Sequence, residues 1–435
     1  MDLSPQHARR AALIAGMGRG VAIIPTAPER PRNRDSDFPY RFDSYFHYLS
    51  GFPEPESVVV LVAGDTPKSI LFCREKNLER EIWDGHRYGP EAAREIFGFD
   101  EAHAVGELDE MMPQLMSNRH AVYFAPGIDA AWDARVTGWL NAVRALVRTG
   151  VTAPAEIRDV HVQLDEMRLV KDPTEIATMR RAGVISAAAH CRAMRTARPG
   201  LAEYHLEAEI LHEFRREGSQ FPAYGSIVAS GPNACVLHYR ENDRIMMDGD
   251  LVLIDAGCEL DGYASDITRT FPANGKFSAT QKTVYDIVLA AQAAAIAEVT
   301  PGSTWDRPHD AATRVLAQGM IDLGLCKGPL EVLIESGDYK RFYMHRTGHW
   351  LGRDVHDCGD YKKDGEWRHL KPGMVLTVEP GFYIREADDI PKEFWNIGVR
   401  IEDDVLVTET GCEIISSGAP KTTADIESLM RGART

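Results

Sequence analysis

The sequence predicts a protein of two domains, an α/β domain over residues 1–165 and an α+β domain over residues 166–435. A chain of 435 residues is long enough for two or three domains with sizeable cores. Strand-length apolar runs alternate with helical patterns in the first part, whereas strands and helices are clustered in the second part. The boundary falls near Ile157–Asp172, and a helix predicted over Ala155–Val170 links the two parts.

The first domain contains four short apolar runs that have the length and composition of β-strands. These runs are Val21–Ile24, Val58–Val62, Ile70–Cys73 and Ala121–Phe124, and helical patterns cover Pro90–Phe97 and Asp129–Val147. Residues 29–52, between the first two strands, are rich in Arg, Asp and aromatic residues and are predicted to form a long surface loop. Trp83 has polar neighbours, which indicates that it caps a loop or points at a neighbouring molecule.

The second domain is predicted to begin with a helix that has a clear start signal. Asp172 is suited to the N-cap, Pro173 to the first helical position, and the Glu175 side chain to a bond back to the cap. This helix continues to about Arg198. Further helices are predicted over Tyr204–Arg216, Ala279–Val299 and Arg307–Leu323, and strands over Ser226–Ala229, Leu251–Ile254, Ile267–Phe271, Val375–Val378, Val399–Ile401 and Val405–Val407.

Composition argues against several classes of partner. The net charge of −16 argues against nucleic acid as a partner, because nucleic-acid binding relies on neutralisation of phosphates by Lys and Arg. No apolar run approaches the roughly 20 residues that cross a bilayer, which argues against a membrane protein. Seven scattered cysteines form no CxxC pair, so reduced thiols in the cytoplasm are expected rather than a disulfide framework.

Two aspartates mark the ends of the strands in the stretch Asp250–Phe271. If the hairpin turns about Leu260–Asp261, Asp255 and Asp266 lie directly opposite, with Cβ atoms roughly 4.5–5.5 Å apart. Two bare carboxylates at this distance repel, so that one takes up a proton or both share a cation, and a pair of metal ions is a standard arrangement. The alternative is that Asp255 opens an Asx turn and Asp266 is a solvated strand-end residue.

Three residues further along the chain are candidates for the same site: His349, Glu379 and Glu402. With the two aspartates they make four carboxylates and one imidazole, a set of ligands that suits manganese better than a Cys-rich zinc centre. Each also has a structural interpretation, since Glu379 precedes a turn, Glu402 has acidic neighbours, and a single histidine is more often structural than a ligand.

The spacing of His345 and His349 imitates the two histidines of a zincin helix. Arg346 stands where that motif requires Glu, and Gly348 argues against a helix, so we reject a zincin site. The nearby His356 adds a third imidazole, which favours a functional cluster over isolated structural histidines.

The five candidate ligands stand in an order and in motifs that resemble a known family. The motifs DAG, DITRTF, GHWLG, VEPGFY and RIEDD are similar to those of the dinuclear metallopeptidases of the pita-bread fold, and among these the chain resembles aminopeptidase P, the Xaa-Pro aminopeptidase family. The segments RNRDSDFPYRFDSYFHYLSGFPEPES and EIWDGHRYG resemble its amino-terminal domain. The resemblance covers nearly the whole chain and implies an α/β amino-terminal domain followed by a pita-bread catalytic domain.

The resemblance implies a metal site that holds two ions. Asp255 would bind one metal, Asp266 and Glu402 would bridge both, and His349 and Glu379 would complete the other. Glu379 would also act as general base on a hydroxide or water that bridges the metals. The family is usually manganese-dependent, although Zn²⁺, Co²⁺ or Mg²⁺ can take the place of Mn²⁺ in vitro or in crystals.

The resemblance also implies substrate-binding and catalytic roles for residues around the metals. His238 would sit in the substrate pocket, His356 would hold the substrate carbonyl or relay a proton near the leaving nitrogen, and His345 would line the subsite for proline. Tyr383 and Arg400 would support these groups from behind.

The implied activity is release of the N-terminal residue from peptides that have proline in the second position. The family is cytoplasmic in bacteria and often tetrameric, and a tryptophan in the position of Trp83 reaches the active site of a neighbouring subunit. A homo-oligomer, tetramer or dimer, is therefore expected. One departure is Arg346, where the family commonly has Gly; a cation there would perturb the nearby histidines or favour a longer, acidic substrate tail.

Rival functions share parts of this pattern. A prolidase, which cleaves only Xaa-Pro dipeptides, uses the same ligands, and a phosphotriester hydrolase of the same fold family is a related alternative. A non-catalytic peptide-binding module and a metal-free creatinase-type hydrolase do not need the full ligand set. Proline preference follows only from the resemblance.

Overall fold

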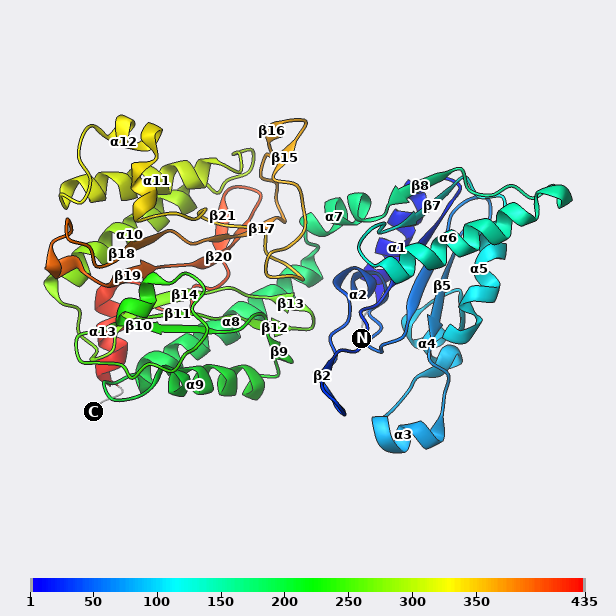
Figure 1. Ribbon diagram of the computed structural model, residues 1–435, viewed down its shortest axis with the longest axis horizontal. Helices are drawn as coiled ribbons and strands as arrows, with labels where there is room; N and C mark the ends of the chain where they lie inside the picture. Colours follow the sequence, from blue (N-terminus) through cyan, green and yellow to red (C-terminus); the bar gives the residue numbers. More distant parts are fainter. Residues whose placement is uncertain (1–2, 433–435) are drawn as a thin grey trace. The chain divides into compact units, whose positions relative to one another are not determined.

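The computed structural model describes residues 3–432 of the chain. The chain divides into two compact units, Met1–Met167 and Arg168–Thr435 (Figure 1). Each unit has its own hydrophobic cores, and each is described separately below. Among the described residues, no helix combines the length and the apolar composition that a membrane span requires.

A six-stranded mixed sheet with strand order β6-β5-β4-β1-β7-β8 forms the centre of the first unit. Its strands are β1 (Gly20–Pro25), β4 (Val58–Val62), β5 (Lys68–Cys73), β6 (Glu101–Ala104), β7 (Ala121–Phe124) and β8 (Glu156–Asp159). Alternate side chains enter two separate cores, so that Val59 and Leu61 face one layer of helices and Val58 and Val60 face the other. The four strands predicted for this half are confirmed.

Helices cover both faces of this sheet. One face packs against α1 (Ser4–Gly16), α2 (Ser44–Ser50) and α4 (Gly89–Phe97), and the other against α5 (Leu108–Met116) and α6 (Ala130–Ala145). The remaining helices that begin in this unit are α3 (Leu78–Asp84) and α7 (His161–Leu169).

Two predictions for this half need correction. Residues 29–52 do not form a plain loop, because they contain a short ribbon, β2 (Pro31–Asn33) with β3 (Ser36–Asp37), and the helix α2, whose first turn is capped by the Asp43 carboxylate. The helix predicted over Ala155–Val170 begins only at His161. The residues before it form β8, which extends the sheet beside β7, because their backbone groups pair with that strand.

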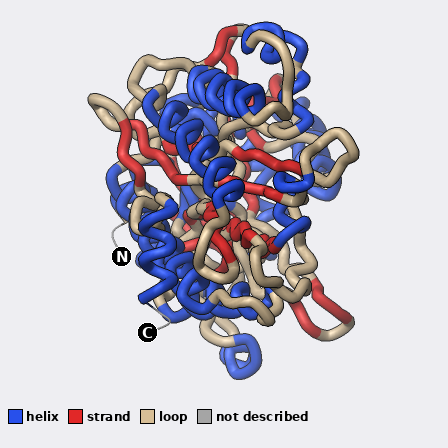
Figure 2. The backbone as a smooth tube through the Cα atoms, turned by 90° about the vertical axis from the view of Figure 1, so that its left-hand side faces the viewer, coloured by secondary structure: helices blue, strands red, loops and turns tan. Residues whose placement is uncertain are grey.

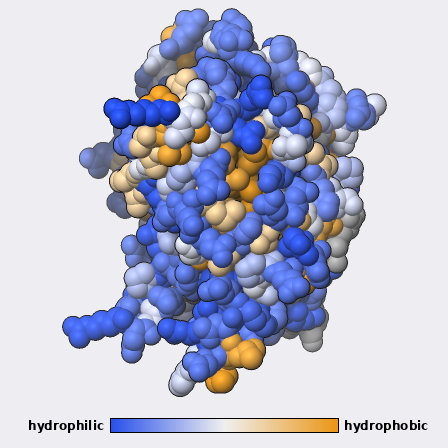
Figure 3. Space-filling model, turned by 90° about the vertical axis from the view of Figure 1, so that its right-hand side faces the viewer, coloured by the Kyte–Doolittle hydropathy of each residue, from blue (hydrophilic) through white to orange (hydrophobic). Residues whose placement is uncertain are grey.

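The helix α3 differs from the others because none of its residues is buried. Leu78, Ile82 and Trp83 are 72%, 81% and 83% exposed. Figure 3 shows hydrophobic residues at the lower end of this face of the molecule, where Figure 1 draws α3. An exposed apolar surface of this kind commonly marks a contact with another molecule.

The second unit places short sheets inside a shell of helices (Figure 2). The sheets are β10-β11-β14, β13-β12-β9, β17-β20-β21, β18-β19 and β15-β16. The strands are β9 (Phe221–Pro222), β10 (Ile227–Ser230), β11 (Leu251–Asp255), β12 (Cys258–Leu260), β13 (Tyr263–Ala264), β14 (Thr268–Pro272), β15 (Lys362–Lys363), β16 (Glu366–Trp367), β17 (Val375–Val378), β18 (Gly381–Ile384), β19 (Ile397–Arg400), β20 (Asp403–Val407) and β21 (Cys412–Ile414).

The helices of the second unit are α8 (Pro173–Thr196), α9 (Glu203–Arg216), α10 (Ala279–Ala297), α11 (Arg307–Asp322), α12 (Leu330–Ser336) and α13 (Thr423–Gly432). The predicted start of α8 is confirmed. The Asp172 carboxylate accepts hydrogen bonds from the backbone of Thr174 and Glu175, and the Glu175 carboxylate accepts one from the backbone of Asp172. The apolar faces of these helices pack on the strands and form one large core.

The register of the hairpin that carries the two aspartates was predicted incorrectly. The turn is centred on Asp261 and Gly262, which both have positive φ, as a two-residue hairpin turn requires. Asp255 therefore lies opposite Thr268 instead of Asp266. Because the shift is two residues and side chains alternate with a period of two, Asp255 and Asp266 still face the same side, as diagonal neighbours.

A buried ion cluster connects the beginning of the second unit to the segment that carries His356. The Asp357 carboxylate accepts hydrogen bonds from the Arg168 guanidinium at 2.6 Å and from the Lys171 ammonium at 3.0 Å. All three side chains are 1% exposed. Burial opposes ionisation of Asp357, but the two cations outweigh it and hold its pKa below the usual range. The cluster therefore fixes the backbone beside His356.

We expect Asp357→Asn to destabilise the protein by about 3–5 kcal/mol, because it removes the carboxylate that pairs with the buried Lys171 and one of the two carboxylates, with Asp354, that pair with the buried Arg168. The folded pKa of Asp357 lies below its unfolded value of about 3.9, so its stabilisation is complete above about pH 4 and is lost as the pH falls through the folded pKa. Urea unfolding at pH 7 measures the loss. Asp389→Asn is the control, because Asp389 pairs with Arg341 at the surface and its side chain is 65% exposed. A change below 1 kcal/mol for Asp357→Asn would contradict this account.

Candidate metal centre

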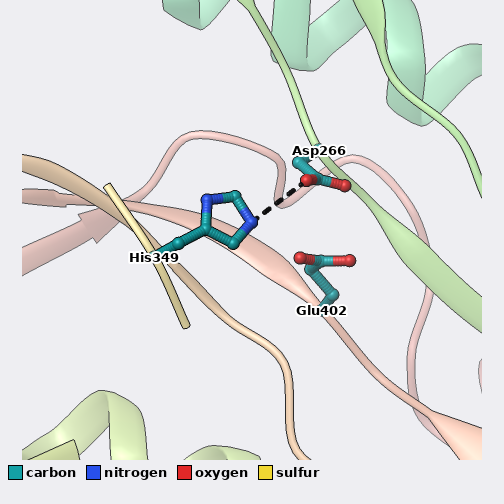
Figure 4. Close-up of side chains that lie close together, drawn as sticks. All are labelled: Asp266, His349 and Glu402. Atoms are coloured by element: carbon teal, nitrogen blue, oxygen red, sulfur yellow. Dashed lines mark ion pairs between the residues drawn. The ribbon is translucent and has the colours of Figure 1, made fainter. Parts of the chain in front are cut away.

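A cavity of about 850 Å³ in the second unit brings together the five residues predicted as metal ligands. Asp255 ends β11 and Asp266 precedes β14, whereas Glu379 follows β17 and Glu402 connects β19 to β20. Ligand atoms of Asp266, His349 and Glu402 lie within 4.8 Å of one another, and Figure 4 shows the three side chains converging. The strand ends thus supply an oxygen-rich set on one wall of the cavity.

Backbone packing fixes the orientation of His349. A Cβ atom on Gly348 would lie 2.0 Å from the carbonyl oxygen of Thr377, so only glycine lets this segment lie so close to β17. The Nδ1 atom of His349 lies 2.9 Å from the carbonyl oxygen of Trp350, to which it donates a hydrogen bond. The lone pair of Nε2 is then directed at the carboxylates, 3.4 Å from Asp266 and 3.8 Å from Glu379. This is the tautomer that a metal ligand requires.

The four carboxylates repel one another in a buried setting. Burial and the charge of Asp255 raise the pKa of Asp266 well above its usual value, and burial and the charge of Asp266 do the same for the pKa of Glu402. Burial and the charge of Glu402 raise the pKa of Glu379 to about 8. Burial also opposes ionisation of Asp255, but the Arg400 guanidinium keeps its pKa lower than usual.

These residues fit a divalent metal. Four carboxylates and one arginine leave an excess of three negative charges, and the raised pKa values show that the protein alone does not compensate it. Carboxylate oxygens with one imidazole suit hard and borderline cations such as Mn²⁺. Asp255, Asp266, His349, Glu379 and Glu402 are the side chains that would hold such ions.

A chain of hydrogen bonds supports the carboxylates from behind. Arg400 donates to Asp255 at 2.7 Å and to the Tyr383 hydroxyl at 3.0 Å, and that hydroxyl lies 2.8 Å from Nε2 of His345. Nδ1 of His345 donates to the carbonyl oxygen of Arg346. Burial and the charge of Arg400 lower the pKa of His345 to about 3. His345 is therefore neutral, and both its nitrogens are engaged.

His238 and His356 are exposed side chains that line the same cavity. The ring of His356 meets that of His349 edge-on at 4.4 Å, and burial and the charge of His349 lower the pKa of His356. Trp83 belongs to the first unit, on the exposed helix α3.

Sequence reasoning missed two residues of this site. The Tyr224 hydroxyl contacts the carboxylates of both Asp255 and Asp266, and burial with these two charges raises its pKa. Thr268 donates to Glu402 at 2.7 Å and accepts from Arg400. The correct hairpin register would have indicated Thr268, because it places Thr268 opposite Asp255. No sequence signal indicated Tyr224, which lies outside any predicted element.

Two family models and several known proteins match this chain. The family model of metallopeptidase family M24 matches residues 177–409, and the model of the aminopeptidase P N-terminal domain matches residues 6–123. The Xaa-Pro aminopeptidase of Escherichia coli is 48% identical over 429 residues, which cover 98% of this chain and 97% of that protein.

Solved structures agree over the full length. The aminopeptidase PepP of Pseudomonas aeruginosa superposes with a TM-score of 0.98 at 51% identity and covers 100% of this chain and 99% of its own. Zinc-substituted Escherichia coli aminopeptidase P in complex with product gives a TM-score of 0.97 at 46% identity, with coverage of 100% and 99%. The predicted fold, an α/β amino-terminal domain followed by a pita-bread catalytic domain, is confirmed. The chain belongs to the metallopeptidase family M24 and, within it, to the Xaa-Pro aminopeptidases that carry an aminopeptidase P N-terminal domain.

Proposed function

We propose that this protein hydrolyses the bond between the N-terminal residue and a following proline, with two Mn²⁺ ions at the five-ligand centre. The catalytic domain then comprises residues 166–435 and the amino-terminal domain residues 1–165. The observation that carries the proposal is the convergence of four buried carboxylates and the Nε2 atom of His349 on one cavity. The names of the relatives supply the substrate class.

The chemistry requires a nucleophile, polarisation of the scissile carbonyl and protonation of the leaving nitrogen. When bound, two divalent ions supply an activated water and polarise the carbonyl. Glu379 would accept the proton of that water, because bound divalent ions would lower the pKa of this buried carboxylate and keep it ionised near pH 7. His356 has no hydrogen bond to another described residue, so its ring is available to hold the carbonyl or to move a proton to the prolyl nitrogen.

Other side chains shape the substrate site. His238 contributes an exposed imidazole to the cavity and is assigned to substrate binding. His345 and Tyr383 line the subsite for proline; because both nitrogens of His345 are engaged, positioning suits it better than proton transfer. Arg400 keeps Asp255 ionised and ordered for metal binding.

We expect manganese-dependent release of the N-terminal residue from an Xaa-Pro-Yaa tripeptide, and a loss of that activity when a chelator removes the metal. An Xaa-Pro dipeptide assayed in parallel separates the closest alternative, because a prolidase cleaves the dipeptide alone. Supplying Mn²⁺, Zn²⁺, Co²⁺ or Mg²⁺ to the stripped protein identifies the ion that restores the highest kcat/KM. Cleavage of neither peptide by the manganese-loaded protein would refute the proposal.

We also propose a cytoplasmic homo-oligomer, a tetramer or dimer, in which α3 contacts a neighbouring subunit and Trp83 contributes to that subunit's substrate site. Support comes from the exposure of Leu78, Ile82 and Trp83 on a helix with no buried residue. The seven cysteines are all free thiols, in keeping with a reducing compartment. Light scattering tests the assembly, and a monomer would remove the role of Trp83.

A further inference from the structure

A second cavity, of about 490 Å³, continues from the catalytic cavity. Arg346, Gly348 and Tyr361 line both cavities, so the two are joined along this edge. The second cavity is completed by residues of the β15–β16 hairpin and of the segment before α11, and we call it the distal groove. Its remaining lining residues are Trp305, Asp360, Lys362 and Trp367.

Two cations stand over one aromatic ring in the distal groove. The Arg346 guanidinium lies 5.5 Å from the centre of the Trp367 ring, and the Lys362 ammonium lies 4.3 Å from it. Both cationic residues are exposed, whereas Trp367 is half-buried. Cation–π contact holds the charges in place and leaves their hydrogen-bond donors free.

Neither the Arg346 guanidinium nor the Lys362 ammonium forms an ion pair with a described residue, although the charge of Arg346 acts at longer range on Asp310. Asp360 is the one acidic residue that lines the groove, so its lining carries a net positive charge. Asp306 lines a narrow neighbouring cavity with Arg346, but no ion pair connects them in the described structure.

Two further aromatic side chains, Trp305 and Tyr361, line the groove. The Trp305 ring lies 4.6 Å from that of Tyr361, which in turn stacks on the buried Trp350 at 5.8 Å. A groove with aromatic side chains and two unpaired cations is suited to an extended peptide that carries a carboxylate, since the rings pack its apolar atoms and the cations bind its charge.

We propose that the distal groove binds the part of the peptide that follows proline, and that Arg346 and Lys362 select peptides with a carboxylate there. The inference rests on the proposed function. The position of the groove supports this, because Arg346 follows His345, which is assigned to the proline subsite, and lines both cavities, whereas none of the five candidate metal ligands lines the distal groove. The carboxylate is either the C-terminus of a short peptide or the side chain of Glu or Asp in a longer one.

The test compares kcat/KM for peptide pairs within each protein. Ala-Pro-Ala-Glu amide and Ala-Pro-Ala-Gln amide differ only in a side-chain charge, and Ala-Pro-Ala-Gln with a free C-terminus adds the main-chain carboxylate. We expect the manganese-loaded wild-type protein to prefer a charged member of the set by about 3- to 10-fold, and the preference to fall as salt screens the pairs. The charged peptide that the protein prefers shows whether the groove binds the side-chain carboxylate or the C-terminal carboxylate.

Variants assign this preference to the groove. We expect Arg346→Gln to reduce the charged-to-neutral ratio at least twofold, the double variant with Lys362→Gln to bring it near one, and Arg346→Lys to retain most of it. Lys363→Gln is the matched control, because this neighbouring lysine of β15 lies outside the groove and its loss keeps the ratio. The ratio of kcat/KM for the charged peptide to that for the neutral peptide is measured on one protein preparation. A smaller fraction of folded enzyme lowers both values equally and therefore leaves the ratio unchanged.

Two results would overturn the inference. A wild-type ratio near one for every pair would remove the selection of carboxylates while leaving Xaa-Pro cleavage intact. A ratio that survives in the double variant would place the selection elsewhere in the site. Failure to cleave even the neutral peptide is a different result, because it refutes the proposed function and the inference together.

Discussion

Glu402→Ala is expected to remove metal binding and peptide hydrolysis together. Glu402 is 1% exposed, and one of its carboxylate oxygens lies within 4.8 Å of ligand atoms of Asp266 and His349. Loss of a residue that supports a metal ligand from behind costs about 10–100-fold in affinity or activity, so loss of Glu402, which we propose as a direct ligand, is expected to cost more than 100-fold in both. Metal content of the purified protein and kcat/KM for an Xaa-Pro-Yaa peptide measure the two effects.

The metal-free state gives an independent readout for the same variant. Burial and the charge of Asp266 raise the pKa of Glu402, which means that its ionised form destabilises the metal-free fold near pH 7. The metal-free variant should therefore melt no lower than the metal-free wild type, whereas the rise in Tm on addition of Mn²⁺ should disappear.

Glu413→Ala is the matched control, because Glu413 forms a surface ion pair with Arg180 and its side chain is 40% exposed. It should keep both metal and activity. Normal metal content and normal turnover in Glu402→Ala would refute the assignment of Glu402 as a ligand.

The position of the candidate metal site could be predicted from the sequence because its carboxylates stand at strand ends. Asp255, Glu379 and Glu402 each follow an apolar strand, and such strands can be recognised from local composition. The error in hairpin register left the prediction intact because a shift of two residues keeps Asp255 and Asp266 on one face. The Asp-Gly pair at 261–262, which favours a two-residue turn, was the signal that sets the correct register.

Other parts depended on contacts that local sequence does not encode. Tyr224 reaches both aspartates because β10 pairs with β11 across a long separation in sequence. The sequence of β8 is compatible with the beginning of a helix. It forms a strand because its backbone groups pair with those of β7. The distal groove is formed by Arg346 together with a hairpin that begins at Lys362, and only the folded chain brings their side chains over the same ring.

Glu379→Gln is expected to separate the two proposed roles of Glu379, ligand and general base. Glutamine has the same shape and keeps one oxygen that can ligate, but it cannot accept a proton at neutral pH. Loss of general-base catalysis costs typically about 10²–10⁴-fold, so we expect kcat to fall by this amount while KM changes little. Metal content should stay much closer to wild type than in Glu402→Ala.

Single-turnover rates and metal content, measured on the same preparation, decide the question. A slow chemical step with both ions retained would establish that the base is lost while the site persists. Loss of metal from Glu379→Gln would make its role that of a ligand alone, and a wild-type rate would remove the general-base role altogether. In the metal-free protein, burial and the charge of Glu402 raise the pKa of Glu379 to about 8, and bound divalent ions would lower that pKa, so that the carboxylate is ionised and able to accept a proton near pH 7.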